Sequence, residues 1–175
     1  MTATATPIAD VPGATTGWVR GRLIGDAPII APLSGRPSWY YKIVVEQVGA
    51  IVGDDGGRRL AYEACGQSFE IDDGTGVALI DPEGAQVEVD YDHAVEVMPG
   101  ARLVQPLAEL VRRFKLPDGP VVFREGILAT GEVVAINGRL RPEADPEPGR
   151  GAIWIRVAGA GRERVFVSER SIDRW

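Results

Sequence analysis

Side chains able to perform acid–base or nucleophilic chemistry are few and scattered in this chain. Its one histidine, His93, is the only residue whose ordinary pKa lies near neutrality, and Asp90 and Asp92 stand close enough in sequence to assist it. Its one cysteine, Cys65, has no neighbouring motif that activates a thiolate. We interpret His93 as a surface residue beside a strand and Cys65 as a small, buried or half-buried residue.

The same inventory offers little to a metal ion or a nucleotide. One His and one distant Cys are too few nitrogen and sulfur ligands for a zinc site, and Asp72-Asp73-Gly-Thr-Gly76 does not follow the EF-hand pattern. Gly159-Ala-Gly161 is too short for a dinucleotide fingerprint. The sequence therefore predicts a protein that is not an enzyme and uses no cofactor, which leaves partner binding as its function.

Acidic residues form the strongest chemical pattern. The net charge is −6, and no Lys or Arg occurs between Arg59 and Arg102. This acidic stretch is interpreted either as a solvated face or as a docking face for a basic partner. An aromatic run precedes it, and aromatic side chains are common interface anchors as well as core residues. The candidate protein-binding residues are Asp72, Asp73, Asp81, Glu83, Trp39, Tyr40 and Tyr41.

The elements that must position these residues are mostly strands, because alternating patterns recur between turns rich in the chain's 22 glycines and 13 prolines. Predicted turns follow at Asp73–Gly76, Asp81–Gly84 and Asn137-Gly138, and a final hairpin is predicted around Gly159-Ala-Gly161. Gly53–Gly57 is predicted to be a mobile turn. The predicted strands cover residues 18–24, 39–46, 68–72, 77–80, 86–91, 132–136, 139–141, 152–157 and 164–167.

One α-helix is predicted near residues 105–116. Apolar residues stand there at positions i, i+3, i+4 and i+7, and they are Leu107, Leu110, Val111 and Phe114. Pro106 suits the first turn and Pro117 ends the helix. We interpret this stripe as core packing.

Strands at this spacing with one helix predict a mainly β protein with an OB-like β-barrel. We expect a flexible N-terminal arm over residues 1–16 and a single barrel domain over residues 17–175. The arm lacks the basic and apolar parts of a signal peptide, and no apolar run is long enough to span a bilayer. The sequence favours a soluble, cytoplasmic protein, with membrane association through a partner as an alternative.

Several segments together resemble the GIDE-type domain of mitochondrial E3 ubiquitin ligases and its bacterial relatives. The matching segments are Gly17-Trp-Val-Arg-Gly21, Ala31-Pro-Leu-Ser-Gly-Arg-Pro37 leading into Trp39-Tyr-Tyr41, Phe69-Glu-Ile-Asp-Asp-Gly-Thr-Gly76, Asp81-Pro-Glu-Gly-Ala85 and Glu125-Gly-Ile-Leu-Ala-Thr-Gly-Glu-Val-Val-Ala-Ile-Asn-Gly138. The resemblance implies a membrane-adjacent domain that engages proteins. It does not imply ligase activity, because a RING segment needs more Cys and His ligands than this chain has.

The leading hypothesis is a non-catalytic protein-interaction, or adaptor, domain whose partner is a protein of unknown identity. The first alternative is a structural subunit that assembles with copies of itself or within a larger particle. The second is OB-type nucleic-acid binding, which we rate below the others because the central hairpin has no basic residue. An Arg-rich C-terminal part could form a small basic patch, although interspersed acids dilute it.

Overall fold

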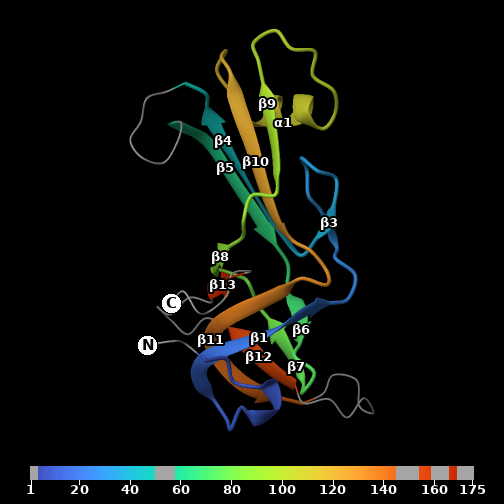
Figure 1. Ribbon diagram of the computed structural model, residues 1–175, viewed down its shortest axis with the longest axis vertical. Coiled ribbons are helices and arrows are strands. Elements are labelled where there is room, and N and C mark those ends of the chain that lie inside the picture. The colour runs from blue at the N-terminus through green and yellow to red at the C-terminus, as the bar shows by residue number, and fades with distance from the viewer. Residues whose placement is uncertain (1–3, 50–57, 145–153, 159–165, 169–175) are drawn as a thin grey trace.

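The protein folds into two β-sheet lobes arranged along its long axis (Figure 1). The structure is a computed structural model that describes residues 4–49, 58–144, 154–158 and 166–168. A barrel occupies the lower part of the view, and the sheet formed by strands β4, β5, β9 and β10 occupies the upper part together with helix α1. We call these two parts the barrel lobe and the upper lobe.

The barrel lobe is a closed β-barrel in which each strand pairs with two neighbours. Its strands are β1 (Thr15–Ile24), β6 (Phe69–Asp72), β7 (Val77–Ile80), β11 (Val133–Glu143) and β12 (Trp154–Ala158). They follow one another in the order β1-β6-β7-β12-β11, and pairing of β1 with β11 closes the barrel. Only β7 and β12 are parallel among these neighbours. The prediction of a mainly β protein with an OB-like barrel and one helix is confirmed.

Alternation along the barrel strands explains why they close around one core. On β1, Val19 and Leu23 are fully buried while Arg20 and Arg22 are exposed. Because successive side chains of a strand point to opposite faces, this pattern gives the strand an apolar inner face and a charged outer face. Phe69 on β6 contributes one of the largest buried side chains to the same core.

The upper lobe is formed by two insertions into the barrel, one between β1 and β6 and the other between β7 and β11. Its sheet has the order β5-β4-β10-β9, with β4 at Tyr40–Gln47, β5 at Arg58–Gly66, β9 at His93–Val97 and β10 at Val121–Leu128. Helix α1 (Leu107–Phe114) buries Leu110 against Ile43 and Phe123 in a second core. The predicted helix and its packing role are therefore confirmed, but the barrel alone does not contain all of residues 17–175.

Short elements complete the chain. They are the 3₁₀ helix η1 (Ile8–Asp10) and the strands β2 (Ile29–Ile30), β3 (Pro37–Ser38), β8 (Gln86–Glu88) and β13 (Phe166–Ser168). Strand β13 pairs with β11 on one side and with β8 on the other, so these two strands extend the barrel sheet beyond its closed part.

Two predicted hairpin turns are wrong, because the strands on either side of them pair with other strands. Strand β11 runs through Asn137-Gly138 without turning, because Asn137 pairs with Trp18 on one side and with Phe166 on the other. The predicted final hairpin is also wrong, since β11 lies between β12 and β13 and pairs with both. The turns at residues 73–76 and 81–84 are confirmed, whereas the expected turn at residues 53–57 lies outside the described part of the chain.

The expected flexible arm is corrected for the residues next to the barrel. Ile8 is fully buried in the barrel core, and its backbone N–H donates to the Asp73 carboxylate at 2.7 Å. The backbone of Thr6 donates to the carbonyl of Trp18 on β1 at 2.8 Å. Ile8 and Val11 of this segment both belong to the barrel core, and burying an isoleucine side chain alone is worth about 2 kcal/mol.

Strand β10 holds the loop between β2 and β3 through a buried carboxylate. Glu125 is fully buried, and its two carboxylate oxygens accept the backbone N–H groups of Leu33 at 2.7 Å and Ser34 at 3.0 Å. Above this contact, the exposed Arg36 forms an ion pair with Asp92. The loop between β2 and β3 is therefore held on β10 by a charge that has two N–H donors, as a buried carboxylate requires.

Candidate functional site

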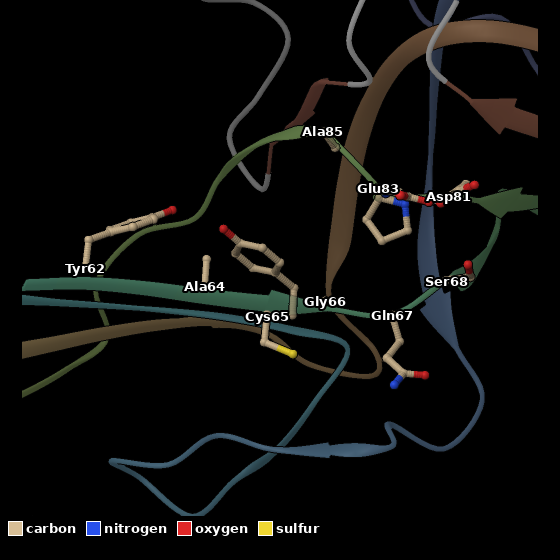
Figure 2. Close-up of a pocket in the computed structure, with 11 residues that line it drawn as sticks. Tyr62, Ala64, Cys65, Gly66, Gln67, Ser68, Asp81, Glu83 and Ala85 are labelled. Carbon is tan, nitrogen blue, oxygen red and sulfur yellow. The ribbon is translucent and has the colours of Figure 1, made fainter. Parts of the chain in front are cut away.

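An open cleft lies where the upper lobe meets the barrel, and we define it as the junction cleft. It has a volume of about 560 Å³ and lies between the end of β5 and the turn that follows β7 (Figure 2). Its lining includes Tyr40, Tyr62, Ala64, Asp81 and Glu83. A volume of this size is within the range of small-ligand pockets, roughly 300–1,000 Å³, and it admits a side chain of a partner protein.

Two tyrosines form the upper-lobe side of the junction cleft. Tyr40 is only 8% exposed, whereas Tyr62 on the neighbouring strand is 54% exposed. Burial, a side-chain hydrogen bond with Tyr62 and the charge interactions with that residue and Tyr91 raise the pKa of Tyr40 far above its usual range. The exposed ring of Tyr62 also makes a cation–π contact with Arg59, whose guanidinium lies 5.9 Å from the ring centre.

Two carboxylates form the barrel side of the junction cleft. Asp81 follows β7 directly and accepts the backbone N–H of Glu83 at 3.1 Å, which fixes the turn between them. Figure 2 shows both acids across the cleft from Tyr62 and Ala64. Among the described residues, no Lys or Arg lines the cleft, and neither Asp81 nor Glu83 forms an ion pair. Tyrosine rings that face these carboxylates give the cleft the chemistry of a site for a cation.

The prediction that Cys65 is buried or half-buried is wrong, because this residue is exposed. It belongs to β5, which is an edge strand of the upper sheet and has a neighbour on one side only. Its side chain points to the opposite face of β5 from Ala64, although the residue belongs to the lining of the junction cleft (Figure 2). His93, the one histidine, lies on β9, at the other edge of the sheet.

The remaining two aromatic candidates do not line the junction cleft. Tyr41 is 8% exposed in the second core, and its hydroxyl donates to Glu63 at 2.8 Å. Burial, followed by the hydrogen bond and charge of Glu63, raises the pKa of Tyr41 despite the opposing effect of Arg113. Trp39 is half-buried, and its indole N–H donates to Thr130 at 3.0 Å. Both side chains form hydrogen bonds within the fold.

Asp72 and Asp73 lie at the opposite end of the β6–β7 hairpin from Asp81. A four-residue strand separates them from it, which is about 13 Å. Asp73 is fully engaged: one carboxylate oxygen accepts the Ile8 N–H, and the other accepts the backbone and hydroxyl of Thr75 and the N–H of Gly76. The acidic candidates thus form two separate groups, of which only Asp81 and Glu83 reach the cleft.

The Asp73 anchor has a consequence for stability at low pH. Partial burial alone would raise the pKa of this carboxyl, but the hydrogen bonds from Ile8, Thr75 and Gly76 outweigh burial and lower it. A folded-state pKa below the unfolded value, about 3.9, gives stability that is present above that value and is lost as pH falls through the folded pKa. We expect the N-terminal segment to detach in that acidic window, seen as faster amide exchange at Ile8.

The variant Asp73→Asn distinguishes the contact of Asp73 with Ile8 from its contacts within the turn. The amide oxygen can keep the Thr75 and Gly76 contacts, while the NH₂ group meets the Ile8 N–H and cannot accept it. We expect a loss of about 1–2 kcal/mol in urea unfolding at pH 7 and protection lost selectively at Ile8. Asp10→Asn is the matched control, because no hydrogen bond to that carboxylate is found among the described residues. Equal protection of Ile8 in both variants would contradict the anchor.

Sequence reasoning missed Tyr62, the most exposed aromatic residue of the cleft. Residues 58–66 carry no regular alternation of apolar and polar side chains, so no strand was predicted there. The structure makes this segment β5 through eight residues of pairing with β4, in which Tyr62 stands opposite Val44. The available signal was the spacing of Tyr62, Ala64 and Gly66 two residues apart, which places them on one face of any extended segment.

Fold and site together define the class of protein: an OB-like barrel with an inserted β lobe and an acidic, aromatic cleft at their junction. No protein-family model, curated protein or solved structure matches the chain. Across the described residues, no group of three or more His, Cys, Asp or Glu side chains is arranged to hold a metal ion. None of the helices in that part of the chain has the length and apolar character needed to cross a membrane.

Proposed function

We propose that this chain is a non-catalytic protein-interaction domain, an adaptor, and that the junction cleft receives a Lys or Arg side chain from a basic segment of its partner. The observation that carries the proposal is the composition of the cleft: two tyrosines, two carboxylates and no basic residue. A cation entering it would meet the Tyr62 ring and the charges of Asp81 and Glu83 together. The resemblance to the GIDE-type domain, a protein-engaging domain, supports the same function.

The position of the cleft supports this proposal as well. Its two sides belong to different lobes, and the floor at Gly66 is open because this residue has no side chain. A Cβ atom at position 66 would lie 2.9 Å from a ring carbon of Tyr40 and 3.7 Å from Pro82. Any larger residue would therefore fill the space between the tyrosine and the acidic turn.

The variant Ala64→Arg tests the cleft directly. Ala64 is exposed and faces the cleft, so a long cationic side chain there would occupy the site and neutralise its charge without disturbing a core. We expect partner affinity to fall at least about tenfold, which corresponds to ~1.4 kcal/mol. Ala101→Arg, in an exposed loop beyond β9, adds the same charge and should leave affinity unchanged.

The partner is first identified by gentle crosslinking of the tagged chain in its native cells, followed by mass spectrometry. Titration of that partner then compares the parent chain with Ala64→Arg, Ala101→Arg and Asp81→Asn, the last of which keeps an oxygen for the Glu83 N–H. If one foreign protein is recovered and still binds the Ala64→Arg variant, the junction cleft is not its binding site. If only large species of the chain itself are recovered, the adaptor proposal is wrong and the chain is a self-assembling subunit.

A further inference from the structure

Five exposed arginines lie on the outer wall of the barrel, and none of them belongs to the lining of the junction cleft. We call them the arginine stripe: Arg20, Arg22, Arg139, Arg141 and Arg156. The first two belong to β1, the next two to β11 and the last to β12. Their strand neighbours Val19, Leu23 and Leu140 are buried in the barrel core, so alternation places all the stripe residues on the outer face.

The stripe is continuous although its residues are far apart in sequence. Strands β1 and β11 are paired from Arg22 opposite Val133 to Thr15 opposite Leu140, and Arg139 stands opposite Thr16. Along β11, the distance from the Val133 row to Arg141 is eight residues, or about 27 Å. Trp18, half-buried on the same outer face, lies between the arginines of β1 and those of β11.

This concentration of charge costs stability. Arg141 and Arg156 are direct cross-strand partners, and like charges in that position are destabilising. Arg156 is relieved by an ion pair with Glu143 at 3.0 Å, and Arg22 donates to the carbonyl of Gly131. For the other three arginines, no ion pair is formed with any residue that the structure describes. Within the described part of the chain, these three guanidinium groups are exposed and have no carboxylate partner.

Guanidinium geometry and spacing define the partner. Arginine binds a carboxylate through two parallel hydrogen bonds. Arg20 and Arg22 are two residues apart on one face of a strand, as are Arg139 and Arg141, which separates each pair by about 6.7 Å. An extended peptide presents alternate side chains at the same spacing, so its carboxylates would match the arginines when every second residue is acidic.

The overall charge favours a short acidic peptide over a nucleic acid. The whole chain has a net charge of −6, and Asp72 lies directly opposite Arg22 at one end of the stripe. A long polyanion that extends past the stripe is repelled by this acidic surface, whereas a segment about 27 Å long contacts the stripe alone. We propose that the arginine stripe binds an extended protein segment with Asp or Glu at alternate positions, separately from the junction cleft.

Fluorescence anisotropy tests the proposal with three labelled probes at equal salt. They are an eight-residue peptide of alternating Glu and Ser, which spans about 27 Å when extended, a peptide of the same composition with all Glu in one block, and an oligothymidylate. We expect the alternating peptide to bind at least about fivefold more tightly than the block peptide and to lose about tenfold in affinity in R139Q/R141Q. R102Q/R112Q removes two exposed arginines of the upper lobe and should not change the affinity.

Each other outcome overturns the proposal. Equal affinity for the alternating and block peptides would reduce the stripe to unspecific charge attraction. Tighter binding of the oligothymidylate would make it a nucleic-acid surface, and absence of binding by all three probes would remove the site. R139Q/R141Q changes exposed residues outside the junction cleft, whereas Ala64→Arg changes a residue inside it. The two variants therefore test two separate surfaces.

Discussion

Replacing Glu125 with alanine is expected to lower the free energy of unfolding by about 3 kcal/mol or more. The carboxylate is fully buried and accepts the backbone N–H groups of Leu33 and Ser34. Each buried donor left without an acceptor costs about 1–3 kcal/mol, and alanine leaves two. Urea unfolding measures the total loss, and amide exchange at Leu33 and Ser34 shows whether it starts in the loop between β2 and β3.

Two further variants sharpen this prediction. Glu125→Gln keeps the volume and one acceptor oxygen but points an NH₂ group at the second N–H, so about half of the loss should remain. Glu96→Ala removes an exposed glutamate from the same sheet and should change stability by no more than about 0.5 kcal/mol. If Glu125→Ala behaved like Glu96→Ala, the carboxylate would not be the anchor of that loop.

Gly126→Ala is expected to destabilise the protein by about 3 kcal/mol, the upper end for overpacking. Here the chain passes from the barrel to β9 directly over β10, and the added methyl group would overlap the carbonyl oxygen of Asp90. It would also lie 3.2 Å from the carbonyl carbon of that residue and 2.9 Å from a methyl group of Val89. Backbone atoms cannot turn aside as a flexible side chain does, so the crossing itself must move.

The matched control is Gly17→Ala on β1, another strand glycine. A Cβ atom there would meet only the side chain of Leu140, at 3.7 Å, which is ordinary contact. We expect Gly17→Ala to unfold close to the parent midpoint, while Gly126→Ala unfolds at clearly lower urea concentration. Similar midpoints for both variants would show that the crossing over β10 is loose enough to accept a side chain.

The two proposed surfaces give the adaptor a defined arrangement. The junction cleft is acidic and aromatic, whereas the arginine stripe is basic and lies on the barrel wall. One domain could then hold a basic segment and an acidic segment at once, which suits a protein that brings partners together. Because the surfaces share no residue, each can be removed without the other.

Local patterns in the sequence were sufficient for many elements. The alternation at Phe69 and Ile71 predicted β6, and Gly74, with φ of 84°, forms the turn into β7. The helical stripe beginning at Leu107 predicted α1, and Pro117 follows its end. Each of these signals lies within a few neighbouring residues, where backbone preference and the division into apolar and polar faces act directly.

Long-range pairing decided the rest. Asn137-Gly138 favours a hairpin turn, yet β11 is paired on both sides at Asn137, and those ladder contacts outweigh a local turn preference. The sequence likewise shows Glu125 and Leu33 as unrelated positions, and their contact exists only because β10 lies next to the inserted loop.

Both candidate surfaces have the same origin. The charges and rings were visible in the sequence, including Tyr40, Asp81 and the arginines of β11. Composition along the chain determines which chemistry is available. In the sequence, however, the acids form one continuous stretch, and the C-terminal arginines are interspersed with acids. Only the tertiary structure places Asp73 and Asp81 at opposite ends of a hairpin and brings the arginines of β1 beside those of β11. The reason is that neighbours in a barrel are set by strand pairing and not by distance along the chain.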